Sequence, residues 1–148
     1  AIDCNEIITH VLSDLSETVN NTNAVIEVDN LPEIKAQSTY MRLLFQNLIS
    51  NAIKFVKPDV QPKIRISCSE TSKDWKFSVE DNGIGIDQKH LDQVFIIFKR
   101  LNNVTLYRGY GIGLAHCKKI VELHHGEIQV KSKVDKGSTF SFTLSKSL

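Results

Sequence analysis

The chain has 148 residues, the size of one ordinary domain, which excludes a multidomain assembly. Hydrophobic residues make up 41% and charged residues 24%, a composition that is typical of globular proteins and excludes a disordered or fibrous chain. Eighteen basic residues stand against seventeen acidic ones, and the formal charge of +1 gives no sign of a nucleic-acid-binding surface.

The predicted elements are helices and strands that do not alternate in a regular βαβ order. Apolar residues recur at helical spacing in some segments and alternate with polar residues in others. In chain order, these patterns predict a helix at 3–19, a strand at 24–28, a helix at 39–56, strands at 63–69 and 74–81, a short helix at 87–98, a helix at 111–124, and strands at 127–133 and 138–144. This order favours an α+β sandwich, with one sheet covered by helices on one face, as a single domain over residues 1–148.

The helix predicted at 39–56 carries a polar stripe beside its apolar one. At about 100° per residue, Asn47, Asn51 and Lys54 fall close together on one side. Asparagine is a mediocre helix former because its amide competes for backbone hydrogen bonds. Two asparagines one turn apart in a helix therefore suggest a functional role. Amide oxygens suit a hydrated Mg²⁺ ion, and the lysine suits the phosphates that accompany it. The alternative is an ordinary solvated polar face.

Asp81 breaks the pattern of the strand predicted at 74–81. Alternate apolar residues of this strand share one face, and Asp81 continues that inward phase. A carboxylate there needs a hydrogen-bond donor, since burying an unpaired charge is costly. One donor would be the amino group of a ligand such as adenine, because Gly83 and Gly85 let the backbone approach closely. The alternative is an Asx-type turn, in which Asp81 accepts bonds from the backbone amides that follow it.

A second group of glycines, Gly109, Gly111 and Gly113, precedes the helix predicted at 111–124. Exposed amides at a helix N-terminus, together with the helix dipole, bind anions such as phosphate. The spacing completes neither a Walker loop nor a GxGxxG motif. Taken alone, it also fits an ordinary mobile loop.

Apolar runs and cysteines indicate the compartment. No apolar run approaches the roughly 20 residues that span a bilayer, so we expect no membrane segment in this fragment. Three widely spaced cysteines without a CxxC pair fit a reducing cytoplasm better than a disulfide framework or a zinc site. Because the sequence does not begin with Met, we expect a fragment of a longer protein.

Five short motifs follow one another along the chain. They are Asn47-x3-Asn51-Ala52-x-Lys54-Phe55, Asp81-Asn82-Gly83-Ile84-Gly85-Ile86, Phe95-Ile96-Ile97-Phe98-Lys99-Arg100, Gly109-Tyr110-Gly111-Ile112-Gly113-Leu114 and Lys136-Gly137-Ser138-Thr139-Phe140. In this order they resemble the N box, first glycine box, F box, second glycine box and third glycine motif of sensor histidine kinases. The resemblance covers essentially the whole chain, and the short segment 100–109 most resembles the phytochrome-like branch.

This resemblance implies both the fold and the ligands of the family's catalytic, ATP-binding domain. The fold would be the Bergerat-type two-layer α/β sandwich, with a mixed, mostly antiparallel sheet of about five strands and about three helices on one face. The cofactors would be ATP and Mg²⁺. The chain would lack the dimerising helical hairpin that carries the phosphoacceptor histidine in this family.

The resemblance also implies roles, residue by residue. Asn51 would coordinate Mg²⁺ with Asn47 close by, and Lys54 would meet the phosphates. Asp81 would accept a hydrogen bond from the adenine amino group. The other nucleotide-binding residues that it implies are Gly83 and Gly85 in the pocket floor, Gly109, Gly111, Gly113 and Leu114 at the hinge of the ATP lid, and Thr139 at the adenine end.

The F box departs from the family pattern. Ile97 occupies the place where many relatives carry an arginine. The cation facing the γ-phosphate is therefore expected to be Arg100, Lys99 or Arg108.

Two other departures affect the lid and the last helix. Tyr110 stands where Thr or Ser is usual, and its bulk would restrict the lid. His125 replaces a frequent glycine after the last helix, at a place where a left-handed conformation is needed, which His tolerates better than most residues.

Asn47 distinguishes branches of the superfamily. Gyrase-like ATPases carry a glutamate there as the base that activates water, whereas a neutral asparagine cannot take a proton. The resemblance therefore implies a protein histidine kinase, with Asn47, Lys54 and Arg100 as catalytic residues, that transfers phosphate to a histidine of its own dimerisation domain and onward to a response regulator. None of the five histidines stands in the family's H-(E/D)-x-x-x-P setting. The fragment is therefore expected to be inactive without the dimerisation domain. Through that domain, the full-length protein is expected to be a homodimer.

Two alternatives stay open at this point. One is a serine kinase of the anti-sigma type with the same fold. The other is a degenerate nucleotide-sensing or protein-binding module, which the substitutions at Ile97 and Tyr110 suggest.

Overall fold

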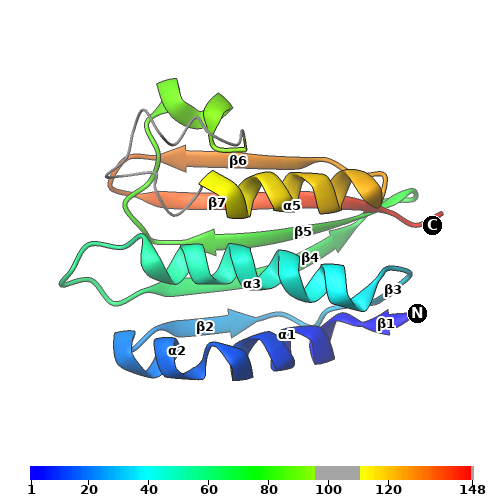
Figure 1. The fold of residues 1–148 in the computed structure, drawn as a ribbon, viewed down its shortest axis with the longest axis horizontal. Coiled ribbons are helices and arrows are strands. Elements are labelled where there is room, and N and C mark those ends of the chain that lie inside the picture. The colour runs from blue at the N-terminus through cyan, green and yellow to red at the C-terminus, as the bar shows by residue number, and fades with distance from the viewer. Residues whose placement is uncertain (96–110, 148) are drawn as a thin grey trace.

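The computed structural model describes residues 1–95 and 111–147 of the chain (Figure 1). The helices are α1 (Cys4–Asp14), α2 (Ser16–Thr22), α3 (Ser38–Lys54), the 3-10 helix η1 (Gln88–Gln93) and α5 (Gly111–Leu123). The strands are β1 (Ile2–Asp3), β2 (Val25–Val28), β3 (Glu33–Ile34), β4 (Lys63–Glu70), β5 (Asp74–Asp81), β6 (Ile128–Lys133) and β7 (Gly137–Ser145).

One five-stranded sheet forms the base of the domain, in the order β2-β4-β5-β7-β6. The β2–β4 pair is parallel, and the other three pairs are antiparallel. Figure 1 shows α1, α3 and α5 lying side by side across one face of this sheet. The predicted α+β sandwich with a mixed, mostly antiparallel sheet is confirmed.

The core lies between the helices and the sheet. Phe45 of α3 points into its centre, where its ring lies 5.7 Å from that of Phe77 on β5 and 5.5 Å from that of Phe142 on β7. All three rings are almost completely buried, and the edge-to-face geometry of the Phe45 contacts is favourable for aromatic pairs. This contact fixes α3 over the middle of the sheet.

The helix predicted at 3–19 is divided into α1 and α2. Asp3 caps α1, because its side chain accepts a hydrogen bond from the Asn5 amide at 2.9 Å. Leu15 leaves the helical conformation, with φ −97° and ψ 8°, although its amide still bonds to the Val11 carbonyl. The break does not change which residues face the core, so the apolar spacing in the sequence carried no sign of it.

The short strands β1 and β3 were not predicted, and the helix η1 differs from the predicted one. Strands β1 and β3 pair with each other at Ile2 and Ile34, and two residues are too few to show a period. The helix predicted at 87–98 is the 3-10 helix η1 over Gln88–Gln93, residues 94 and 95 form a turn, and residues 96–98 lie outside the described residues. Asp87 caps η1 through the Lys89 amide at 3.1 Å.

His125 follows the end of α5 in the left-handed conformation, with φ 58°. This confirms the conformation that we expect at a place where relatives carry glycine. Its amide bonds to the Glu122 carbonyl and the amide of Gly126 bonds to the Val121 carbonyl, so the last helical carbonyls are satisfied.

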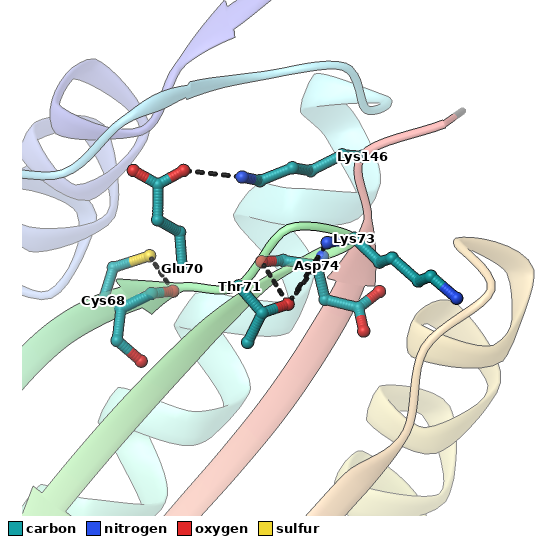
Figure 2. Close-up of polar contacts among 7 residues, drawn as sticks. Cys68, Glu70, Thr71, Lys73, Asp74 and Lys146 are labelled. Carbon is teal, nitrogen blue, oxygen red and sulfur yellow. Dashed lines mark hydrogen bonds and ion pairs between the residues drawn. The ribbon is translucent and has the colours of Figure 1, made fainter.

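The β4–β5 hairpin closes at the end of the sheet where both chain termini lie (Figures 1 and 2). Thr71 Oγ1 accepts a hydrogen bond from the Asp74 amide at 3.0 Å, which stabilises the turn. Figure 2 shows Lys146 reaching from the strand end toward Glu70, with 2.6 Å between Nζ and Oε2. The same ammonium lies 4.6 Å from the centroid of the Trp75 ring, so it ties the C-terminal segment to the hairpin.

In the described parts of the chain, no helix combines the length and the apolar character needed to cross a membrane.

The aromatic contact of α3 predicts a large loss of stability for Phe45→Ala. Removing a fully buried ring leaves a cavity, which costs about 3–5 kcal/mol. Urea denaturation should show this loss in the free energy of unfolding. The control is Leu43→Ala on the same helix, where the side chain is 43% exposed and the expected change is below about 0.5 kcal/mol. A loss below about 1 kcal/mol for Phe45→Ala would contradict the description of the core.

Candidate functional site

The helix-covered face of the sheet changes from apolar to polar at one end. Residues in register across β4, β5, β7 and β6 form rows on this face. Two rows are mainly apolar: Cys68, Phe77, Phe142 and Ile128, then Ile66, Val79, Phe140 and Val130. In the next row Asp81, Ser138 and Ser132 follow Ile64 on adjacent strands, and we call these three residues the polar row. The polar row therefore closes the core at this end.

Asp81 is the charged member of the polar row. Its Oδ1 accepts hydrogen bonds from the amide of Gly83 at 2.9 Å and from the amide of Ser138 at 3.1 Å. None of the described residues donates to Oδ2. The bond from the Gly83 amide forms the Asx-type turn that the sequence offered as an alternative. Because both hydrogen bonds go to Oδ1, the second oxygen, Oδ2, can still accept a hydrogen bond from a ligand.

The environment of Asp81 makes its ionisation costly. Burial raises the pKa of its carboxyl from 3.8 to about 6, and the hydrogen bonds from Gly83 and Ser138 lower it by less. The neighbouring charge of Glu80 contributes a smaller rise, and the pKa of about 6 results from all of these causes together. At neutral pH the group is therefore mostly ionised, and a further donor would stabilise it.

Residues 82–87, which we call the glycine loop, are held from two sides. On one side the Ile84 amide donates to the Phe55 carbonyl at 2.8 Å, and a side chain at Gly83 would clash with that same carbonyl oxygen. On the other side the Asp135 amide donates to the Ile84 carbonyl at 2.8 Å. Gly85 has φ 74° and passes so close to the Lys133 carbonyl that a Cβ would clash with it. Both glycines are thus required by the close approach of neighbouring backbone.

The polar stripe of α3 meets the start of α5. Asn51 is buried, with 7% of its surface exposed, and Asn47 is half-buried one turn before it. A Cβ at Gly113 would lie 3.2 Å from Asn47 Oδ1, so the first turn of α5 packs directly against this stripe. Lys54 is exposed, and its ammonium lies 5.6 Å from the centroid of the Phe55 ring.

The N-terminus of α5 begins at Gly111, next to these amides. Its first backbone amides and the helix dipole make it suitable for an anion. Leu114 is fully buried in the core, so its side chain anchors α5.

Comparison with known proteins agrees with this geometry. The family model described as "Histidine kinase-, DNA gyrase B-, and HSP90-like ATPase" matches residues 36–148. The chain belongs to this family. It is 47% identical over 133 residues to cyanobacterial phytochrome A of Nostoc sp., covering 90% of this chain and 17% of that protein. It is 42% identical over 142 residues to phytochrome-like protein Cph1 of Synechocystis sp., covering 96% of this chain and 19% of that protein.

Solved structures show the same fold. The catalytic domain of histidine kinase ThkA, in a nucleotide-free form, superposes with a TM-score of 0.82 at 26% identity, over 98% of this chain and 93% of that one. Full-length ShkA in complex with AMPPNP superposes with a TM-score of 0.80 at 22% identity, over 97% of this chain and 30% of that one. The chain is thus a histidine kinase catalytic domain of the phytochrome and sensor kinase type, and it spans about a fifth of the length of its phytochrome relatives.

Within this kinase domain, the expected residue at the adenine end needs correction. Thr139 pairs with Glu80, and strand alternation turns both away from the face that holds Asp81. Ser138 is the residue in register with Asp81 and donates its amide to it. We therefore replace Thr139 by Ser138 as the neighbour of Asp81.

Several predicted residues of the kinase motifs cannot be placed. Positions 96–110 lie outside the described residues, and they include Ile97, Lys99, Arg100, Arg108, Gly109 and Tyr110. Of the predicted site residues that the structure describes, Asp81 lies with Gly83 and Gly85, and Asn47 and Asn51 lie with the start of α5. Lys54 is exposed at the end of α3, Leu114 is buried under α5, and Thr139 is on the other face of the sheet.

Sequence reasoning missed Ser138 and Ser132. A signal for both was available: Ser132 continues the inward phase of Ile128 and Val130 on β6, and Ser138 continues that of Phe140 and Phe142 on β7. A polar residue at the inward position of two neighbouring strands marks the end of the apolar core.

The burial of Asp81 predicts a pH dependence of stability. Since its folded pKa of about 6 lies above the ordinary 3.8, its stabilising contribution is fully present below about pH 4 and is lost as the pH rises through about 6. Asp81→Asn removes this titration. The free energy of unfolding of the variant, minus that of the wild type, should therefore rise by about 2 kcal/mol between pH 4 and pH 7, since the pKa difference is worth about 1.4 kcal/mol per unit and part of the effect falls below pH 4.

Urea denaturation at a series of pH values measures this difference, in which the other carboxyl groups cancel. Carbon-13 NMR of the Asp81 carboxyl gives the midpoint directly, and we expect it near pH 6. A difference that is flat or falls over this range would refute the assignment.

Proposed function

We propose that this domain binds ATP with Mg²⁺ and transfers the γ-phosphoryl group to a histidine on a separate dimerisation domain, from which it passes to a response regulator. The observation that carries the proposal is Asp81, a half-buried carboxylate whose two backbone donors both bond to one oxygen.

At the base end, Asp81 Oδ2 would accept the adenine amino group. Guanine presents a carbonyl at the corresponding place, which would face the carboxylate unfavourably. Gly83 and Gly85 bring the backbone close to the ring, since neither position has room for a side chain. The base end thus favours adenine over guanine.

At the phosphate end, Asn47 and Asn51 would hold Mg²⁺ through their amide oxygens. Hard oxygen donors suit this ion, and few protein ligands suffice because phosphates and water complete its octahedron. When bound, Mg²⁺ would neutralise charge on the phosphates. The amides at the start of α5, beside Gly113, would bind the phosphate oxygens, and Lys54 would have to turn from the Phe55 ring to reach them.

The residues described at this site favour transfer over hydrolysis. The position at which gyrase-like relatives carry a glutamate base is occupied by Asn47, which cannot accept a proton. Phosphoryl transfer depends mainly on positioning and on charge neutralisation. In this proposal the domain supplies both, while the nucleophile comes from the histidine of the partner domain.

The relatives support this scheme. ShkA was solved with AMPPNP, an ATP analogue, and the sequence relatives are phytochromes several times longer than this chain. We infer that the complete protein also contains a dimerisation domain and acts as a homodimer. ATP as donor and the free cysteines, Cys4, Cys68 and Cys117, fit a cytoplasmic setting.

Nucleotide binding can be tested by thermal shift and calorimetry. ADP at 100 times its Kd, with Mg²⁺, should stabilise the wild type by about 2.7 kcal/mol. Asn51→Ala should weaken binding about 10-fold or more, because an oxygen ligand of the ion is lost. The matched control is Asn21→Ala on the exposed side of α2, which should bind like the wild type. Absence of any shift in the wild type would refute the proposal.

Phosphoryl transfer can be tested with radiolabelled ATP and a histidine-bearing helical hairpin supplied as a separate protein. The domain alone should remain unlabelled, and the hairpin should become labelled on histidine only when the domain is present. Asn51→Ala should abolish this label. Labelling of a serine in a supplied protein would instead indicate a serine kinase, and binding of ADP without any transfer would indicate a nucleotide-sensing module.

A further inference from the structure

Ser132 lies at the β6 end of the polar row. It is half-buried, stands in register with Ser138, and is separated from Asp81 by the single strand β7. Its neighbours along the same face, Ile128 and Val130, pack against the core. A hydroxyl at this place needs hydrogen-bond partners, because burial of an unpaired polar group is costly.

The Ser132 hydroxyl joins segments that are far apart in the sequence. Its Oγ accepts a hydrogen bond from the Ile86 amide at 2.7 Å and donates one to the Gly137 carbonyl at 3.1 Å. The Oγ of Ser138 lies 2.7 Å away. A hydroxyl has one proton and two lone pairs, so with this arrangement Ser138 donates to Ser132. The bonding capacity of the Ser132 hydroxyl is then fully used.

The segments joined by Ser132 are the two that hold Asp81. The Gly83 amide belongs to the glycine loop, which also contains Ile86, the residue whose amide donates to Ser132. The Ser138 amide belongs to the start of β7, where Ser132 also contacts the Gly137 carbonyl. A single hydroxyl thus links the two segments that carry the backbone donors of the carboxylate.

We propose that Ser132 is a positioning residue for base recognition, whose hydroxyl fixes the glycine loop to the start of β7 and so aims the Asp81 carboxylate at the amino group of adenine. Ser132 acts through these bonds and does not touch the ligand. The proposal rests on the proposed function, namely that the domain binds an adenine nucleotide.

Loss of this hydroxyl should affect the site more than the fold. The glycine loop keeps its other ties, the bond from the Ile84 amide to the Phe55 carbonyl and the bond from the Asp135 amide to the Ile84 carbonyl. The Ile86 amide, in contrast, loses its partner, and the side chain of Ile86 is fully buried. The end of the loop must then shift toward another acceptor or toward water, which moves it relative to Ser138.

The test compares the affinities for ADP and GDP by calorimetry in the presence of Mg²⁺. Ser132→Ala should raise the Kd for ADP about 3- to 10-fold, the effect of one hydrogen bond, and leave the Kd for GDP unchanged. Ser132→Thr, which keeps the hydroxyl, should restore the ADP affinity. The matched control is Ser141→Ala, which removes a hydroxyl paired with Ser78 at 3.2 Å on the opposite face of the sheet and should bind ADP like the wild type.

A second readout does not depend on nucleotide. In Ser132→Ala the carbon-13 titration of the Asp81 carboxyl should move to higher pH, because the carboxylate loses the alignment of its donors while the charge of Glu80 stays in place. If Ser132→Ala does not fold, the isosteric pair Ser132→Thr and Ser132→Val replaces it, and only the valine variant should show both effects.

The outcomes separate the two proposals. Equal weakening of ADP and GDP, or an unchanged ADP affinity with an unchanged Asp81 titration, would overturn the role of Ser132. A wild type that binds no ADP would overturn the proposed function instead, and the Asp81 titration would then still decide whether Ser132 orders the donors of this carboxylate.

Discussion

The site depends on one carboxylate placed where the sheet would otherwise continue its apolar core. Asp81 lies on the core-facing side of β5, like Phe77 and Val79 earlier in the same strand. Its burial raises the pKa of the carboxyl to about 6, so the folded chain must supply donors to keep the ionised form. Gly83 and Ser138 supply them through backbone amides, whose direction is set by the chain path and not by a rotatable side chain.

This arrangement explains why the glycine loop is held so closely. A donor amide is useful only at a fixed position, and the loop is fixed by the Phe55 carbonyl on one side and by the β6–β7 turn on the other. Side chains at Gly83 or Gly85 would push the loop away from these contacts. The two glycines therefore allow the loop to pack closely against its neighbours, although glycine in a sequence more often suggests conformational freedom.

Much of the fold could be predicted from the sequence because its elements have clear periods. The alternation in β5 located Asp81 and its inward direction, and the spacing of Asn47 and Asn51 located one side of α3. The motif placed Thr139 at the adenine end, but a motif fixes a position in the chain and not the pairing register. In the sheet it is Ser138 that pairs with Asp81, because adjacent residues of a strand lie on opposite faces.

Other features were beyond the sequence for different reasons. Strands β1 and β3 form only because residues far apart in the chain meet, as Ile2 and Ile34 do. The break at Leu15 leaves the apolar stripe of the helix intact, so no pattern records it. Ser132 is an unremarkable residue in a strand, and its importance arises from a hydrogen bond to Ile86, 46 residues away in sequence.

The raised pKa of Asp81 connects the stability of the fold with its proposed ligand. The unliganded domain keeps a carboxylate ionised at neutral pH in a place that disfavours the charge. A ligand that donates a hydrogen bond to Oδ2 stabilises the ionised form and so must lower this pKa. By linkage, binding of such a ligand near pH 6 must release protons from the protein, whereas a ligand held only by its phosphates leaves Asp81 unchanged. Because a phosphate also titrates near pH 6, the total proton balance contains both ends of the nucleotide, and the titration of the Asp81 carboxyl itself is the quantity that reports whether the base end is engaged.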